Sequence, residues 1–233
     1  MTPELAQLQI HERKDSCVSD NGFCPSWIVH HLDRYTHPLL QHVVLTLVSV
    51  AIGFAIAFAL AILAHRRRRL VGPITNLTGI LYTLPSVAVF FLLLPITGFG
   101  RLTAIIALVS YTLLIIFRNV MAGLDNVPAE AKDAGRGMGL TDRQLLWRVE
   151  LPLALPEIMA GLRIATTTTV GLATLAFFAG AGGLGGEIFS DITFKSNVAV
   201  AGGLAVLLAT VLDAAILLVQ RLITPWARAA RPA

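Results

Sequence analysis

The chain has 233 residues, of which 55% are hydrophobic and 14% are charged, and its mean hydropathy is +0.73. Soluble domains carry about 25% charged residues, so this composition excludes an ordinary soluble domain and indicates a membrane protein. The net charge is only +4, and no basic stretch is interleaved with aromatic residues. Nucleic acid is therefore not expected as a partner.

The chain begins with a polar arm, residues 1–38, which we expect to lie outside the cell. Its first 20 residues lack the apolar core of a secretory signal peptide, so none is predicted. The arm holds both cysteines of the chain, Cys17 and Cys24. A disulfide between them is permitted outside the cell, and two free thiols are the alternative. No tight Cys/His ligand spacing occurs, so no metal site is predicted.

Five apolar segments follow, each long enough to cross the hydrocarbon core of a bilayer as a helix of about 20 residues. They are residues 39–64, 73–97, 102–120, 154–179 and 198–220. The second segment carries Pro85 and Pro95, which predict a kink or a break. The sequence therefore predicts an all-α, multi-pass protein of the cell membrane with five transmembrane helices, in contact with membrane lipid.

The link between the first two segments reads HRRRR and predicts the orientation. Loops rich in Lys and Arg stay in the cytoplasm, so Arg66–Arg69 are expected inside. Five crossings then place the N-terminus outside and the C-terminus inside, with the loop 121–153 and the tail 221–233 in the cytoplasm. Of the 18 Lys and Arg residues, twelve fall in segments that this topology places inside and five in segments outside.

The cytoplasmic loop 121–153 is polar and punctuated by glycine, which predicts a folded module and not a plain connection. Pro128 suits the start of a helix over 129–138, and Gly139 can stop it. Thr141 and Gln144 have the spacing of a capping box, so a second helix is expected to start there. Pro152 is expected to end that second helix.

The spacing within this loop resembles the EAA signature of the permease subunits of binding-protein-dependent ABC importers. That signature is Glu-Ala-Ala, three residues, Gly, nine residues, then Ile, any residue and Leu-Pro. The chain has Asp133-Ala134-Gly135, then Gly139, then Val149-Glu150-Leu151-Pro152, with every interval preserved. Asp133, Gly135 and Val149 replace Glu, Ala and Ile.

Three further stretches resemble the permeases for quaternary-amine osmoprotectants such as glycine betaine, choline and carnitine. They are YTLPSVAVFFLLLPITGFG, LPLALPEIMAGLRIAT and GAGGLGGEIF. The likeness covers roughly residues 39–220. It implies the type I ABC importer permease fold and import of such solutes, with a permease for methionine or another small solute as the alternative.

The resemblance also implies partners. Two permease subunits, identical or related, would line the path, and an extracytoplasmic binding protein would deliver the solute. Each permease would insert its coupling helix, residues 129–138, into a cleft on an ATPase subunit. The residues expected at this coupling site are Glu130, Ala131, Asp133, Ala134, Gly135, Arg136, Gly139, Val149, Leu151 and Pro152.

No phosphate-binding GxxxxGK[ST] loop occurs in the chain, so ATP and Mg²⁺ are expected on the partner ATPase and no cofactor on this chain. A non-catalytic permease subunit is therefore predicted. The rival classes are a membrane enzyme, for which no HExxH or GxSxG motif occurs, and an autonomous channel, which would not need a docking module.

Two charges lie deep inside apolar segments, Arg163 in the fourth and Asp213 in the fifth. An unpaired charge within a bilayer costs about 2.5–3.5 kcal/mol on insertion scales, so the two are expected to pair, as a structural staple or as a gate. Quaternary ammonium groups bind to aromatic faces. Tyr82, Tyr111 and Phe177, with Pro85 at the expected break, are therefore candidates for the substrate path, although aromatic residues in spans also face lipid or core.

Overall fold

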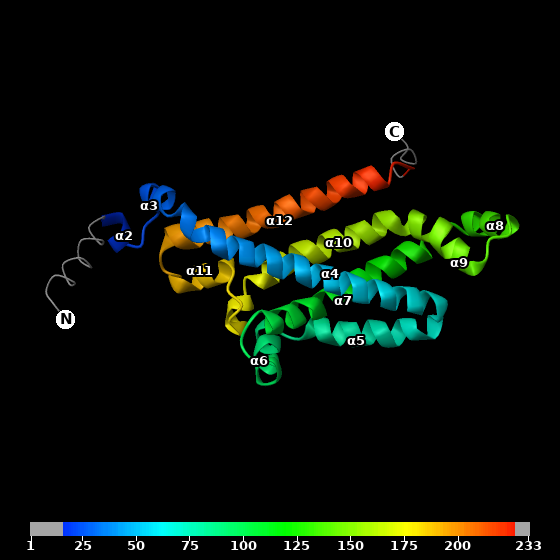
Figure 1. Ribbon diagram of the computed structural model, residues 1–233, viewed down its shortest axis with the longest axis horizontal. Helices are drawn as coiled ribbons and strands as arrows, with labels where there is room; N and C mark the ends of the chain where they lie inside the picture. The colour runs from blue at the N-terminus through cyan, green and yellow to red at the C-terminus, as the bar shows by residue number, and fades with distance from the viewer. Residues whose placement is uncertain (1–15, 227–233) are drawn as a thin grey trace.

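The computed structural model describes residues 16–226, and every regular element within them is a helix (Figure 1). The predicted all-α class is confirmed. Four long helices lie along the long axis of an elongated bundle: α4 (Thr36–Arg66), α7 (Arg101–Asp125), α10 (Leu151–Ala173) and α12 (Lys195–Ile223). Residues 1–15 of the predicted arm and 227–233 of the predicted tail lie outside the described residues.

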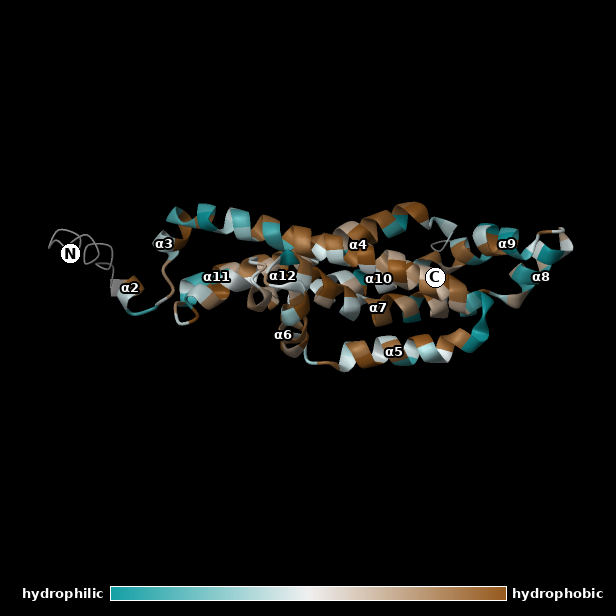
Figure 2. Ribbon diagram, turned by 60° about the horizontal axis from the view of Figure 1, so that its bottom comes forward, coloured by the Kyte–Doolittle hydropathy of each residue, from teal (hydrophilic) through white to brown (hydrophobic). Residues whose placement is uncertain are grey.

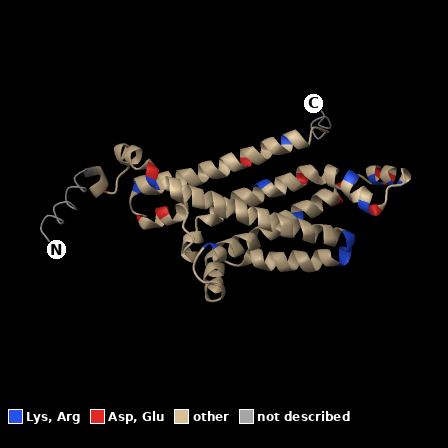
Figure 3. Ribbon diagram, in the orientation of Figure 1, with Lys and Arg blue, Asp and Glu red and all other residues tan. Residues whose placement is uncertain are grey.

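Shorter helices gather at the two ends of this bundle (Figure 1). One end holds α2 (Ser16–Ser19), α3 (Pro25–His30), the 3₁₀ turn η1 (Leu32–Tyr35) and α11 (Leu184–Ser190). The other end holds α8 (Ala129–Gly137) and α9 (Asp142–Leu145). Two short turns, η2 (Arg68–Leu70) and η4 (Ala176–Ala179), join long helices to the next elements. The ends carry the hydrophilic ribbon in Figure 2 and most of the charges in Figure 3.

Within residues 16–226, three helical segments are long and apolar enough to cross a membrane, namely Leu32–Arg66, Arg101–Asp125 and Lys195–Ile223. A fourth is gained if the bent pair Arg68–Thr83 and Ser86–Thr97 counts as one span. The predicted span 154–179 corresponds to α10 and η4 and does not meet this test, because Glu157, Arg163 and a run of four threonines lower its hydropathy. Composition therefore supports up to four of the five predicted spans.

The predicted break in the second segment is confirmed at Pro85. Helices α5 (Val71–Thr83) and α6 (Ser86–Thr97) meet there at 97°. Proline disfavours helical backbone in the residue before it, and Leu84 is extended, with φ −64° and ψ 137°. The hydroxyl of Tyr111 donates a 2.7 Å hydrogen bond to the carbonyl oxygen of Leu84, which the break leaves without a helical partner. Pro95, in contrast, lies inside α6 near its end.

The core of the bundle is the contact between α4, α7 and α10. Small residues of α4 at helical spacing, Ala57, Ala61 and Ala64, are fully buried and belong to one cluster with Ile116 and Val120 of α7. Small side chains let two helices approach closely, which supports packing where lipid supplies no hydrophobic drive. Helix α12 lies at the edge, and none of its apolar window is buried within the chain, so lipid or another subunit must cover it.

The end of the molecule that holds α3 is fastened by a disulfide between Cys17 and Cys24, whose Cα atoms are 5.9 Å apart. The backbone N–H of Cys24 donates to the hydroxyl of Ser196 at 2.7 Å, and that hydroxyl donates to the carbonyl of Gly22 at 3.1 Å. Since Ser196 is in the first turn of α12, the closed loop of residues 17–24 is tied to the start of the last long helix.

A second set of contacts ties η1 to the same region. The hydroxyl of Tyr35 donates to Oδ1 of Asn197 at 2.7 Å, and both side chains are buried. Arg34 donates from Nε to Glu187 of α11 at 2.7 Å. We call residues 17–35 the disulfide cap, because these contacts attach them to the junction of α11 and α12.

Candidate functional site

The predicted coupling helix is present as α8, Ala129–Gly137, which begins directly after Pro128. Its end has the Schellman pattern, in which Gly139 N–H donates to the carbonyl of Arg136 at 2.9 Å and Leu140 N–H donates to that of Gly135 at 3.2 Å. Gly139 has φ +80°, a left-handed conformation that costs L-residues with a side chain about 1–2 kcal/mol. The glycine of the signature is therefore a helix stop.

The predicted second helix starts where its capping box indicates. Thr141 is the N-cap of α9, its side chain accepts from the N–H of Gln144, and the Gln144 side chain accepts from the N–H of Thr141 at 2.9 Å. Helices α8 and α9 pack closely at Gly135. A Cβ there would lie 2.6 Å from Cδ1 of the buried Leu145. The Gly in place of the signature's second Ala therefore fits the close approach of Leu145.

The prediction that Pro152 ends this helix is wrong. A π-helical turn, η3 (Leu146–Glu150), follows α9 and leads without interruption into α10, where Pro152 occupies the first turn. Proline is tolerated there because the wider turn already changes the hydrogen-bond register, and Leu151 N–H reaches back to the carbonyl of Leu146. The coupling module, residues 128–150, is thus continuous with a long helix of the bundle.

The module divides its signature residues between surface and interior. Glu130, Asp133, Ala134, Arg136 and Gly139 are exposed, and Arg136 donates to Asp133 at 3.3 Å on the surface of α8. The remaining residues of the predicted coupling set, Ala131, Gly135, Val149, Leu151 and Pro152, are buried or half-buried. The exposed set forms a face that a partner can contact, and the buried set holds the module to the bundle.

Sequence reasoning missed a charge cluster below this module. Glu150 is 6% exposed, and Nε2 of His65, at the end of α4, donates to its Oε2 at 2.8 Å. Nζ of Lys132, on α8, lies 3.9 Å from the other carboxylate oxygen of Glu150 and donates to the carbonyl of Leu124 at 3.4 Å. Glu150 occupies the unspecified position of the signature, so the motif gave no signal for it. We call His65, Lys132 and Glu150 the basal cluster.

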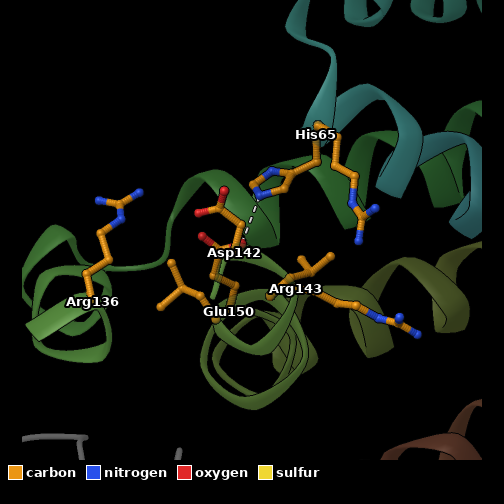
Figure 4. Close-up of a pocket in the computed structure, with 8 residues that line it drawn as sticks. His65, Arg136, Asp142, Arg143 and Glu150 are labelled. Carbon is orange, nitrogen blue, oxygen red and sulfur yellow. Dashed lines mark hydrogen bonds and ion pairs between the residues drawn. The ribbon is translucent and has the colours of Figure 1, made fainter. Parts of the chain in front are cut away.

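His65 and Glu150 of the basal cluster line a cleft of about 520 Å³ between α4 and the module. Figure 4 shows the ring of His65 pointing to Glu150 across it. The other lining residues are Arg66, Arg136, Asp142, Arg143, Leu145 and Leu146. Three of these residues are arginines and only Asp142 is acidic, so the lining beside His65 and Glu150 is basic.

Arg163 and Asp213 lie as a bidentate pair. Nε of Arg163 donates to Oδ1 of Asp213 at 2.8 Å and Nη2 donates to Oδ2 at 2.7 Å. The pair joins α10 to α12, and both side chains are about a third exposed on the single chain, at 30% and 32%. The parallel fork geometry is the strongest form of this contact.

The four candidates for the substrate path fall into two groups. Tyr82 and Tyr111 lie edge to face, with ring centroids 6.2 Å apart, at the break made by Pro85. Phe177 belongs to a different cluster, in which it packs on Phe178 and Phe189 with centroids 4.1 and 4.2 Å away. The Phe178 and Phe189 rings also meet each other, edge to face at 5.5 Å, so the three rings pack pairwise as one cluster.

A family model decides the class of protein. The family described as "Binding-protein-dependent transport system inner membrane component" matches residues 39–229. The chain belongs to this family. It is a multi-pass protein of the cell membrane, and the matched region includes the whole coupling module and all the long helices except the first turn of α4.

Several named relatives of this family are similar in sequence. The choline transport system permease protein OpuBB of Bacillus subtilis is 36% identical over 187 residues, covering 79% of this chain and 86% of that protein. The carnitine transport permease protein OpuCB of Listeria monocytogenes is 37% identical over 206 residues, covering 86% and 94%. The osmoprotectant import permease protein OsmW of Salmonella typhimurium is 37% identical over 192 residues, covering 79% and 89%.

Solved structures of importers share the fold. A chain of the MetNI methionine ABC transporter in an inward-facing conformation aligns with a TM-score of 0.69 and 24% identity, covering 85% of this chain and 96% of that one. A chain of an amino acid ABC transporter solved with histidines aligns with a TM-score of 0.69 and 16% identity, covering 83% and 96%. At these identities the likeness shows the importer permease fold alone.

Proposed function

We propose that this chain is the membrane-spanning subunit of an ATP-driven importer for quaternary-amine osmoprotectants such as glycine betaine, choline or carnitine. The observation that carries the proposal is the identity of 36–37% to choline and carnitine permeases along 79–86% of the chain. Family membership supports transport that depends on a binding protein. The coupling module supports a separate ATPase subunit as the source of energy.

We further propose five crossings, by α4, the broken pair α5–α6, α7, α10 and α12. Helix α10 has 23 residues, or about 34 Å at 1.5 Å per residue, which is enough to cross the core. Arg163, its one basic residue, would be neutralised by Asp213. In this topology the disulfide cap is outside, where disulfides persist, and the coupling module is inside together with Arg66–Arg69, which lie at and just after the end of α4.

The partners in this proposal are two ATPase subunits, a second permease and an extracytoplasmic binding protein. The exposed face of α8, with Glu130, Asp133, Ala134 and Arg136, would contact the ATPase, which would bind ATP and Mg²⁺. The permease itself would carry out no chemistry. The second permease, an identical copy or a relative, would line the path together with this chain.

Reconstitution in proteoliposomes with its cognate ATPase and binding protein would test the solute class. We expect ATP-dependent uptake of radiolabelled glycine betaine, competed by choline or carnitine and not by methionine. An ATPase subunit with its phosphate-loop lysine replaced is the control and should abolish uptake. Competition by methionine alone, or uptake without ATP, would contradict the proposal.

Labelling of a single introduced cysteine would test the orientation in intact cells. The native Cys17 and Cys24 are bonded to each other, so Met138→Cys, at an exposed site of the module, would supply the reactive thiol. We expect a membrane-impermeant maleimide to label it only after permeabilisation. Labelling in intact cells would place the module outside and overturn the topology.

A further inference from the structure

The basal cluster joins side chains from three helical elements. His65 is in the last turn of α4, Lys132 is in α8, and Glu150 is the last residue of the π turn before α10. The Lys132 ammonium also donates to the carbonyl of Leu124 in the last turn of α7, so a fourth helix is included. One carboxylate therefore holds the coupling helix to three long helices of the bundle.

Burial separates this cluster from the other ion pairs near it. The His65 and Glu150 side chains are 13% and 8% exposed. The side chains of the Arg68–Asp125 pair are much more exposed, at 56% and 47%, and so are those of the Arg136–Asp133 pair, at 59% and 73%. Water replaces a lost contact in exposed pairs, whereas removing one partner of a buried pair leaves the other charge uncompensated. Among the ion pairs near the module, the basal cluster is therefore the one whose loss should most affect the position of the module.

Helix α4 is also fastened to α10 at the opposite end. Nε2 of His42, which is fully buried, donates to the carbonyl of Val170 at 3.0 Å. That carbonyl is free because the N–H of Thr174 donates to Gly171. Gln41, which directly precedes His42, accepts a hydrogen bond from the N–H of Gly183 at 3.0 Å. Gly183 lies in the glycine-rich turn before α11.

The two fastenings make α4 and α10 an antiparallel pair held at both ends. The distance between them is roughly 30–35 Å along either helix, at 1.5 Å per residue. The module continues directly into α10, and its ion pair with α4 is the contact between His65 and Glu150. Without it, the module can move on the π turn while the helices stay in place.

We propose that Glu150, held by His65 and Lys132, is a positioning residue that makes the coupling module and the α4–α10 pair move as one body during transport. This rests on the proposed ATP-driven import. Neither the signature nor the names of the relatives assign a role to these three side chains. Loss of the cluster should leave ATP hydrolysis in place and uncouple it from uptake.

The test uses substitutions that remove or keep the hydrogen bond between His65 and Glu150. His65→Leu removes the N–H donor, whereas His65→Gln places an amide N–H near the Nε2 position and is the conservative rescue. Glu150→Leu removes the carboxylate from the other side. Arg68→Gln, which breaks the exposed neighbouring ion pair, is the matched control. Each variant is studied in the full complex with ATPase and binding protein.

Two measurements distinguish positioning from general stability. The first is solute taken up per ATP hydrolysed, together with the midpoint of thermal unfolding. The second is the separation of two nitroxide labels, at Arg67→Cys and Met138→Cys, within one permease, with labelled chains diluted in unlabelled ones. It is read by electron–electron double resonance without nucleotide and with ATP on a hydrolysis-deficient ATPase. This second readout does not depend on the solute.

For the parent chain, His65→Gln and Arg68→Gln, we expect one narrow distribution of label-to-label distances. It should be the same without nucleotide and with ATP. His65→Leu and Glu150→Leu should broaden it and reduce uptake per ATP by about threefold or more, with hydrolysis retained. An unchanged separation and unchanged ratio in His65→Leu would overturn the inference. So would a fall in unfolding midpoint and hydrolysis equal to the fall in uptake. A parent complex that moves no quaternary amine but keeps the narrow separation would refute the proposed function alone.

Discussion

Gly139 shows how a single residue sets the shape of the coupling module, because only its backbone conformation lets α8 end and the chain turn to α9. Gly139→Ala forces a side chain into the left-handed region, and we expect it to destabilise the module by about 1–2 kcal/mol. Gly137→Ala, inside α8 with no atom within 4 Å of the added Cβ, is the matched control and should be neutral or stabilising. The midpoint of thermal unfolding of the purified permease measures both. Equal effects at the two positions would contradict this role.

The Arg163–Asp213 pair gives a second prediction at this scale. Asp213→Asn leaves the guanidinium of Arg163 unpaired at the contact of α10 and α12, at a cost of about 2.5–3.5 kcal/mol on insertion scales. We expect less permease in the membrane fraction and a lower uptake. The exchanged pair, Arg163→Asp with Asp213→Arg, should recover much of the loss. Unchanged abundance and uptake in Asp213→Asn would show that the pair is dispensable.

Among the elements, α9 depends on its cap because it has only four residues. Thr141→Ala removes the acceptor for the N–H of Gln144 and should destabilise the module by about 1 kcal/mol. Thr141→Ser keeps a hydroxyl and should restore the parent value. Hydrogen exchange of the amides in residues 142–146 would report the change, and identical protection in all three chains would argue against the cap.

The coupling module was predictable because its signals are local. Pro128, Gly139 and the Thr141–Gln144 box each act within a few residues, and each marks the predicted boundary. Pro152 was misread because the rule for proline assumes α-helical register, and a π turn precedes it. No hydropathy pattern predicts the π turn.

Contacts between distant residues were less predictable. His65 and Glu150 are 85 residues apart, and neither a period nor a motif relates them. The pairing of Arg163 with Asp213 was predictable because an unpaired charge in a bilayer costs free energy. Few opposite charges lie within the apolar segments to pair with. The broken second segment followed from Pro85 for a similar reason, since proline acts on the residue next to it.

For the whole molecule, the disulfide cap links α3, η1, α11 and the start of α12 into one unit. Cross-linking a loop of this size should stabilise the folded state by about 2 kcal/mol in the chain-entropy account. We expect the Cys17→Ser, Cys24→Ser chain to unfold at a lower temperature. Adding a reductant should lower the midpoint of the parent chain to that of the double variant and leave the variant itself unchanged. Insensitivity of the parent to reductant would contradict a stabilising role.

The continuity of α4 has a consequence for how this permease can vary. Successive residues of a helix are rotated by about 100° about its axis, so the direction of the His65 side chain relative to that of His42 depends on the number of residues between them. A single inserted or deleted residue in that interval would turn one imidazole away from its acceptor while the other stayed in place. Point substitutions along the lipid-facing side of α4 carry no such penalty. The length of this helix is therefore more constrained than the composition of its exposed side.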